Sequence, residues 1–291
     1  MLRRLKRAVN ALLRRATGLE LRKVGARRRY RAPETRARLL TAPTFVLCTV
    51  RSGSTLLRVL LDSHSQICSP QELNLRDFNV TARDGYAEKA LNEIGLDVSR
   101  LEYVLWDWIL HRELEESGKR LLVSKAPRNV FIVDRILQCW PDARFIFLLR
   151  HPAAIARSRH QLRPQDDEER NTKMVRRYGE ALEQARQAYD GVTVRYEELT
   201  ADPAAETRRL CEFLGVSWEP TMLEYGRFDH GRFRSGIGDW KEKIRSGEVQ
   251  PSEPPPESIP AGLRALAVAW GYDSGNEIAS VPPAGELQRR S

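Results

Sequence analysis

Short apolar runs alternate along the chain with segments of helical periodicity. Four of the runs have the length and composition of buried β-strands, at residues 44–50, 121–123, 144–149 and 192–196. Helical patterns are found at residues 56–61, 130–140 and 204–214, the last followed by Gly215. Strands separated by helices in this way form a parallel sheet that is covered on both faces. The predicted fold is therefore α/β, with a mostly parallel central sheet flanked by helices.

Other segments of the body do not follow this alternation. Residues 83–117 predict a mostly helical insertion between the first two predicted strands. Its apolar residues Leu101, Leu105, Trp108 and Ile109 share one helical side, which we expect to pack on the body, with a share in an acceptor pocket as the alternative. The charged residues 164–170 and the proline-rich residues 251–260 predict exposed connections, and the end of the chain, residues 276–291, predicts a disordered tail.

The first 40 residues have a pattern of their own. Apolar residues recur there at spacings of three and four, on one face of a basic helix: Leu2, Leu5, Val9, Leu12, Ala16 and Leu19. Such a helix lies on an anionic membrane surface or docks its leucines on the body, and the sequence leaves both open. Nucleic acid is a less favoured partner, because the segment lacks interleaved aromatic residues. We therefore divide the chain into a basic N-terminal arm, residues 1–40, a body, residues 41–275, and the tail.

The charge of the chain follows this division. The whole sequence of 291 residues carries a formal net charge of +9. Residues 1–40 hold 14 basic and two acidic residues and carry +12, whereas the remainder holds 34 basic and 37 acidic residues and carries −3. A basic excess confined to one arm is weak evidence for nucleic-acid binding by the body. A site for an anion in the body must depend on local positive charge.

Composition also bears on location and on metal binding. No apolar run approaches the roughly 20 residues of a membrane-spanning helix, and the basic N-terminus lacks the apolar core of a secretory signal. We therefore expect a cytoplasmic protein, with the arm as an optional contact to the membrane. The four cysteines, Cys48, Cys68, Cys139 and Cys211, are scattered as reduced thiols would be. Their spacing does not suggest a metal site.

The strongest local signal is the sequence RSGST between a predicted strand and a predicted helix. At the carboxyl end of a parallel strand, such a turn offers the free N–H groups of a helix N-terminus to an anion. Gly53 permits close approach of the backbone, and Arg51, Ser54 and Thr55 add donors. The spacing GxxxxGK[ST] of an ATP- or GTP-binding loop is absent, which argues against hydrolysis of these nucleotides.

Together with a later segment, this turn resembles the paired motifs of sulfotransferases that use 3′-phosphoadenosine 5′-phosphosulfate (PAPS). The two segments are TVRSGSTLLRVLLDSH and ARFIFLLRHPAAIARSR, and the resemblance extends from residue 44 to about residue 243. It implies that the 5′-phosphosulfate lies in a P-loop-like turn of Arg51, Ser52, Gly53, Ser54 and Thr55. It also implies that Arg150 and Ser158, eight positions apart, bind the 3′-phosphate.

Further positions are similar to those of this family. Lys125 follows a strand as the family's active-site lysine does, and Tyr196 resembles its nucleotide-contacting tyrosine. The segment RSGIGDWK is similar to a late loop that closes over the nucleotide, although it is one residue shorter and has serine in place of lysine. The resemblance therefore suggests nucleotide contacts for Arg234, Ser235 and Gly236.

The general base is not the histidine that many cytosolic members place two positions after the lysine, because that position is Pro127. In the tyrosylprotein and several bacterial carbohydrate sulfotransferases, a glutamate after the first loop serves instead, and this part of the chain also resembles polyketide-associated sulfotransferases. Glu72, 21 positions after Arg51, occupies the corresponding place. We predict Glu72 as the base, with His111 as the alternative, and interpret His64 as structural.

These assignments predict a sulfotransferase that moves a sulfuryl group from PAPS to a hydroxyl of a small-molecule, carbohydrate or lipid-like acceptor. Glu72 would take the hydroxyl proton, and Arg51 with Lys125 would stabilise the sulfuryl group and the departing phosphate. No metal is needed for this chemistry. The alternatives are a non-catalytic nucleotide-binding protein, or a membrane or nucleic-acid adaptor that carries a relict domain.

Overall fold

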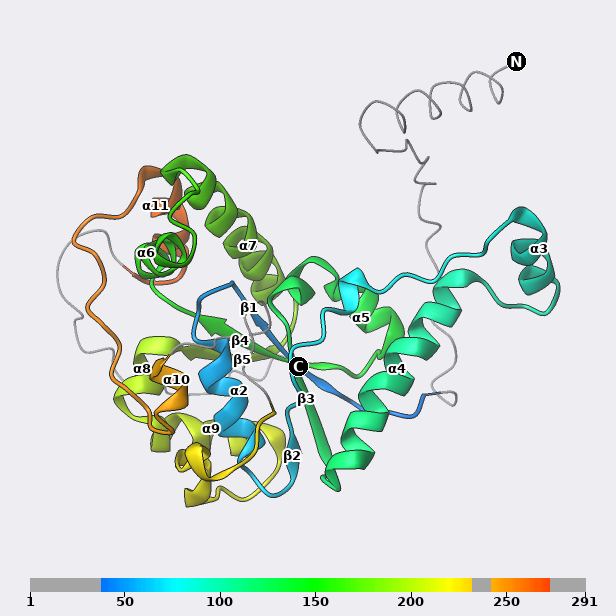
Figure 1. Cartoon of the computed structure of the whole chain (residues 1–291), viewed down its shortest axis with the longest axis horizontal. Helices are drawn as coiled ribbons and strands as arrows, with labels where there is room; N and C mark the ends of the chain where they lie inside the picture. Colours follow the sequence, from blue (N-terminus) through cyan, green and yellow to red (C-terminus); the bar gives the residue numbers. More distant parts are fainter. Residues whose placement is uncertain (1–37, 232–241, 273–291) are drawn as a thin grey trace, which may run out of the picture. The chain divides into compact units, whose positions relative to one another are not determined.

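The computed structural model describes residues 38–231 and 242–272, all within the second of the two units into which the chain divides, residues 33–291. A sheet of five parallel strands lies at its centre, in the order β2-β3-β1-β4-β5 (Figure 1). The strands are β1 (Thr44–Cys48), β2 (Ile67–Cys68), β3 (Leu121–Lys125), β4 (Arg144–Leu149) and β5 (Gly191–Arg195). The described α-helices are α2 (Ser54–Asp62), α3 (Gly85–Glu93), α4 (Val98–Ser117), α5 (Val133–Cys139), α6 (Pro152–Leu162), α7 (Glu168–Ala188), α8 (Tyr196–Ala201), α9 (Pro203–Leu214), α10 (Glu242–Arg245) and α11 (Arg264–Ala269).

Side chains of β1 alternate between two buried layers. Val46 and Cys48 join the hydrophobic cluster that includes leucines of α2 and α9. Phe45, on the opposite face, packs with its ring centroid 5.5 Å from that of Trp140. Figure 1 shows α7 on one side of the sheet and α2, α8 and α9 on the other. Burial of both faces explains why the central strands are continuous apolar runs.

The topology places the ends of three segments at one edge of the sheet. β3 and β4 lie on either side of β1, and the chain leaves β1 toward β2 and leaves β3 toward β4. In open parallel sheets, ligands bind beyond the carboxyl ends of the strands next to such a reversal of direction. The RSGST turn follows β1, Lys125 ends β3 and Arg150 follows β4. The fold therefore brings the predicted site residues of these three segments to the same edge.

The predicted α/β class and the four predicted strands are confirmed, with shifts at their ends. β1 stops at Cys48 because Thr49 already belongs to the turn, where its carbonyl accepts a hydrogen bond from Ser52. The single helix predicted at residues 130–140 is wrong: a 3-10 helix, Pro127–Phe131, and α5 are separated at Ile132, whose φ of −134° is not helical. The two-residue strand β2 was not predicted, since it is too short to give a pattern.

The structure differs from the predictions for one connection and for one helix face. The loop predicted at residues 164–170 is shorter than expected, because α7 begins at Glu168. It is also not fully exposed, since Asp166 in this loop is buried. The insertion is helical and lies between the first two predicted strands, β1 and β3, as predicted, with the unpredicted strand β2 before it. The packed side predicted for its helix is wrong: Tyr103, Trp106 and Leu110 of α4 are buried, whereas Trp108 is 53% exposed. Burial of the aromatic rings of Tyr103 and Trp106 stabilises the helix more than burial of the predicted side would.

Several predictions concern residues outside the described part of the chain. These are the amphipathic helix of the arm, the loop with Arg234, Ser235 and Gly236, and the tail at residues 276–291. Within the described residues, none of the helices combines the length and the apolar character needed to cross a membrane.

Candidate active site

The turn between β1 and α2 has an unusual backbone. Arg51 has a φ of 64°, in the left-handed region that non-glycine residues rarely occupy, and Gly53, the N-cap of α2, has a φ of 85°. A Cβ atom at residue 53 would lie 2.1 Å from Cδ2 of Tyr196. The Tyr196 ring therefore lies directly against the turn. Both the conformation and this contact require glycine at position 53.

We expect Gly53→Ala to lower both the free energy of unfolding and the affinity for nucleotide. The left-handed conformation alone costs an alanine about 1–2 kcal/mol, and the new methyl group would also displace the Tyr196 ring. Urea unfolding measures the first effect and titration with 3′-phosphoadenosine 5′-phosphate (PAP) the second. Gly85→Ala is the control, because a Cβ atom there meets no atom within 4 Å. Equal effects of the two substitutions would refute this account of the turn.

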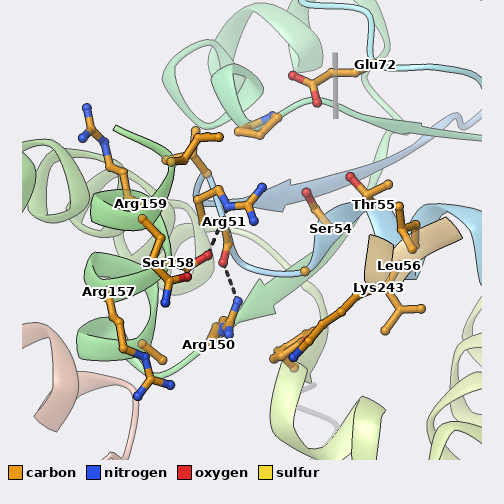
Figure 2. A pocket seen from close by; sticks show the side chains of 18 of the residues that line it. Arg51, Ser54, Thr55, Leu56, Glu72, Arg150, Arg157, Ser158, Arg159 and Lys243 are labelled. Atoms are coloured by element: carbon orange, nitrogen blue, oxygen red, sulfur yellow. Dashed lines mark hydrogen bonds between the residues drawn. The ribbon is translucent and has the colours of Figure 1, made fainter. Parts of the chain in front are cut away.

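The predicted phosphate-binding residues of two distant segments are joined in the structure. The Arg51 side chain donates from Nε to Oγ of Ser158 over 3.1 Å, and Nη1 of Arg150 donates to the carbonyl oxygen of Arg51 over 2.9 Å. Figure 2 shows both hydrogen bonds, with Ser158 and Arg150 on one side of Arg51 and Ser54, Thr55 and Glu72 on the other. Ser158 lies in α6, which begins just after Arg150. The first turn and the second motif thus form one cluster.

Arg150 is held between the turn and an aromatic ring. Its guanidinium carbon lies 4.3 Å from the centroid of the Tyr196 ring. Burial lowers the pKa of Arg150, and the nearby Tyr196 and Glu197 act in the opposite direction. Its Nε atom is buried and has no hydrogen-bond partner among the described residues. A cation with an unused buried donor at the end of β4 is suited to binding an anionic group.

The hydroxyl groups of the turn have different surroundings. Ser52 is fully buried and donates its hydroxyl to the carbonyl of Thr49 over 2.8 Å. Its side chain therefore shapes the turn, so that any contact with a ligand would come from its backbone. Ser54 and Thr55, at the first two positions of α2, line a cleft together with Arg51 and Gly53.

This cleft has a volume of about 1160 Å³ and is strongly basic. Its described lining includes the acidic residues Glu72, Glu248 and Glu253. Eight basic residues line it as well: Arg51, Arg128, Arg150, Arg157, Arg159, Arg163, Lys243 and Arg245. The local excess of positive charge is opposite in sign to the formal charge of residues 41–291. The cleft is therefore the place where a polyanionic ligand is favoured.

Glu72 and Lys125 form a salt bridge at the edge of the cleft. The Lys125 ammonium lies 2.7 Å from Oε2 of Glu72, with the two side chains 1% and 13% exposed. Glu72 lines the cleft, whereas Lys125 is not among its described lining residues. The structure thus places the predicted base, Glu72, at the cleft and the predicted lysine within hydrogen-bond distance of its carboxylate.

The two histidines singled out from the sequence lie elsewhere. His111 on α4 faces Glu115, with its Nδ1 atom 3.6 Å from Oε2 of that residue, and it is not among the described residues that line the cleft. His64 is fully buried, and its Nε2 atom lies 2.8 Å from the Ser217 carbonyl oxygen. This placement agrees with the structural role predicted for His64.

Several residues of the cleft were not predicted from the sequence. Arg159 lies one position after Ser158 and bonds to Asp166 and Asn171 over 2.8 and 3.2 Å. Arg157 donates to the Pro254 carbonyl over 2.7 Å and so attaches the proline-rich segment to α6. The helical spacing of Asn171, Val175 and Leu182 was the signal that could have revealed α7 and its contact with Arg159.

A parallel sheet in which the turn after the central strand opens a helix is an architecture that α/β phosphate-binding proteins share. Residues 43–220, more than half of the chain, match the sequence model of the Sulfotransferase family, and the chain belongs to that family. The family predicted from the paired motifs is therefore confirmed.

Curated relatives resemble parts of the chain. The nodulation protein NoeE of Sinorhizobium fredii is 34% identical over 125 residues, which are 39% of this chain and 30% of that protein. Protein-tyrosine sulfotransferase 2 of Gallus gallus is 24% identical over 193 residues, 60% of this chain and 51% of that protein. Omega-hydroxy-beta-dihydromenaquinone-9 sulfotransferase Stf3 of Mycobacterium bovis is 24% identical over 161 residues, 47% of this chain and 41% of that protein. The chain thus spans about a third to a half of the length of these relatives.

Solved structures share the fold over most of the chain. The sulfotransferase domain from the Synechococcus olefin synthase has a TM-score of 0.61 and 23% identity, and covers 84% of this chain and 98% of that domain. The sulfotransferase domain from the curacin biosynthetic pathway has a TM-score of 0.59 and 22% identity, with 80% and 99% covered. At these identities the likeness concerns the fold.

Proposed function

We propose that this protein transfers a sulfuryl group from PAPS to a hydroxyl of a small-molecule, carbohydrate or lipid-like acceptor, with Glu72 as the general base. The observation that carries the proposal is the cluster of Arg51, Arg150 and Ser158 beside a basic cleft that Glu72 also lines. Membership of the Sulfotransferase family supports the reaction class.

The residues of the cleft fit a nucleotide with several negative charges. Ser54 and Thr55, at the start of α2, line the cleft, and Arg150 has an unused buried donor. We expect Arg51, Ser54 and Thr55 with the N–H groups of α2 to hold the phosphosulfate, and Arg150 and Ser158 to hold the 3′-phosphate. Tyr196 would support the nucleotide from the start of α8. Arg234, Ser235 and Gly236 are proposed to contact it from the late loop.

Glu72 is suited to receive a proton from an acceptor hydroxyl. It follows β2, lines the cleft and is fixed by the salt bridge with Lys125. A positioned general base contributes about 10²–10⁴-fold to a rate. Arg51 would stabilise negative charge on the transferred group, since sulfuryl transfer depends on positioning and on preorganised charge. Lys125 would act through its salt bridge with Glu72.

Incubation with ³⁵S-labelled PAPS and a panel of hydroxylated acceptors tests the proposal. The panel contains a tyrosine peptide, an oligosaccharide and a long-chain alcohol, one for each acceptor chemistry. We expect labelled product with at least one of them and release of PAP in equal amount. Neither labelled product nor any PAP release above the rate in buffer would overturn the proposed reaction.

A further inference from the structure

Two oppositely charged side chains on α2, one buried and one half-buried, hold two distant segments of the chain. Arg58 and Asp62 lie four residues apart, on one face of the helix. Arg58 donates to the Ser69 carbonyl over 3.1 Å and to the His230 carbonyl over 3.2 Å. Asp62 accepts from the Ser69 N–H over 2.9 Å, and its Oδ2 lies 2.7 Å from Nδ1 of His230. We call these four hydrogen bonds the α2 clamp.

The two residues held by the clamp, Ser69 and His230, lie close in the sequence to residues of the candidate active site. Ser69 lies three positions before Glu72, and its hydroxyl donates to the carbonyl of Val123, two positions before Lys125, over 2.8 Å. The clamp therefore acts on the backbone close to both partners of the Glu72–Lys125 salt bridge. His230 lies four positions before Arg234, which is proposed to contact the nucleotide.

A further contact connects the two clamped segments. The Gln71 side-chain amide donates to the His230 carbonyl over 3.4 Å. A Cβ atom at Gly231 would lie 2.3 Å from Nε2 of Gln71, and Gly231 has a φ of +75°. The residue next to Glu72 is thus in close contact with the segment that follows η5 (Tyr225–Arg227).

Burial makes the clamp costly unless all its groups are paired. Arg58 is 4% exposed and the His230 side chain 2%. Burial lowers the pKa of Arg58, while Asp62 and Glu72 act to raise it. For Asp62, burial would raise the pKa, but hydrogen bonds from His230 and the Ser69 N–H and the charge of Lys119 lower it overall. Apolar residues could fill such a space with comparable stability. Stability alone therefore does not explain why charged residues fill this space, whereas the fixed geometry of their hydrogen bonds does.

We propose that the α2 clamp is a positioning device for the reaction, in which Arg58, Asp62 and His230 fix the carboxylate of Glu72 relative to the phosphosulfate turn. The turn begins α2 and the clamp lies on the same helix, so one rigid element sets both the anion site and the base. An error of about 1 Å in such a geometry is sufficient to reduce a rate by about 100-fold. The inference rests on the proposed sulfuryl transfer and adds positioning residues to it.

His230→Leu tests the clamp, because it removes the bond to Asp62 and fills the space with an apolar side chain. It also removes the contacts of Nε2 with the Tyr225 carbonyl and the Ser63 hydroxyl. PAP release from PAPS is measured with water and with phenol as acceptor. We expect kcat per folded protein to fall by about tenfold or more, with KM for PAPS changed by less than about threefold. His230→Asn, which can still donate to Asp62, should restore much of the rate. His64→Leu is the control, because it also removes a fully buried, hydrogen-bonded histidine, and it should lower Tm without lowering kcat.

A double-mutant cycle separates positioning from a general loss of stability. If the clamp acts through Glu72, then His230→Leu should cause little further loss of kcat in a Glu72→Gln background. A kcat of His230→Leu close to that of the wild type, or a loss that multiplies fully with that of Glu72→Gln, would overturn the inference.

Failure of the proposed reaction has a different signature. In that case the wild type releases no PAP above the rate in buffer, and hydrogen exchange then tests the clamp without any turnover. We expect His230→Leu to lower protection at both residues 69–76 and residues 226–231, and His64→Leu to leave residues 226–231 unchanged. Loss of protection at residues 226–231 alone would overturn the clamp.

Discussion

Glu72→Gln is expected to lower the kcat of sulfuryl transfer by about 10²–10⁴-fold and to leave the affinity for PAP nearly unchanged. The substitution removes the group proposed to receive the hydroxyl proton but keeps a side chain of the same shape that can accept from Lys125. Because it also leaves a buried ammonium without its counter-charge, some loss of stability is expected as well. The rate must therefore be measured per folded protein, with Tm recorded for each variant.

Two further variants make this measurement decisive. Glu219→Gln is the matched control, because Glu219 also accepts hydrogen bonds from a neighbouring segment, at the backbone of Ser65, but is not among the described residues that line the cleft. It should retain the wild-type kcat. His111→Ala tests the alternative base. Full turnover by Glu72→Gln together with loss of turnover in His111→Ala would move the catalytic role to the histidine.

Arg150→Ala should weaken binding of PAP by about 100-fold or more. The guanidinium is expected to make two charge-assisted hydrogen bonds to the 3′-phosphate, each contributing about 1.5–3 kcal/mol, and 1.4 kcal/mol corresponds to tenfold in affinity. The substitution also removes the bond to the Arg51 carbonyl and the contact with the Tyr196 ring, so the turn loses support. Isothermal titration with PAP measures the effect.

Arg144→Ala provides the matched control for this prediction. Arg144 begins the strand that Arg150 follows, and its guanidinium lies 4.2 Å from the centroid of the Phe213 ring. Both substitutions therefore remove an arginine stacked on an aromatic ring, at opposite ends of β4. Arg144→Ala should bind PAP as the wild type does. Similar affinities of the two variants for PAP would mean that Arg150 does not bind the nucleotide.

The sequence predicted the fold where the apolar pattern was strong. β1, β3 and β4 were recognisable because burial on both faces of a parallel sheet produces continuous apolar runs. β5, at the edge of the sheet, was also predicted, although only Val194 in it is buried. β2 has two residues and leaves no such run. The buried face of α4 was misjudged because Glu102 and Asp107 lie in it: each is buried, and Asp107 accepts from the Trp140 indole over 2.8 Å. Buried charged residues interrupt the apolar periodicity of a helix, so the sequence pattern does not identify the face on which they lie.

The candidate site was predictable where its residues belong to motifs of a known family, and its other contacts between distant segments were not. The cluster of Arg51, Arg150 and Ser158 followed from two motifs whose order matched a known family. The contact of Glu72 with Lys125 joins residues 53 positions apart, and that of Asp62 with His230 joins residues 168 positions apart. Such pairings depend on the three-dimensional path of the chain. Local periodicity carries no information about them.

The basic cleft beside the β1–α2 turn is proposed to bind the adenosine 3′,5′-bisphosphate part of PAPS. Thermal unfolding of the wild type with PAP, adenosine 5′-monophosphate, and ATP with Mg²⁺ tests it most directly. A ligand at 100 times its Kd adds about 2.7 kcal/mol, and PAP should therefore raise Tm by about 5 °C or more. Adenosine 5′-monophosphate, which lacks the 3′-phosphate, should stabilise far less. No stabilisation by PAP, or a larger shift with ATP and Mg²⁺, would contradict the assignment of the cleft.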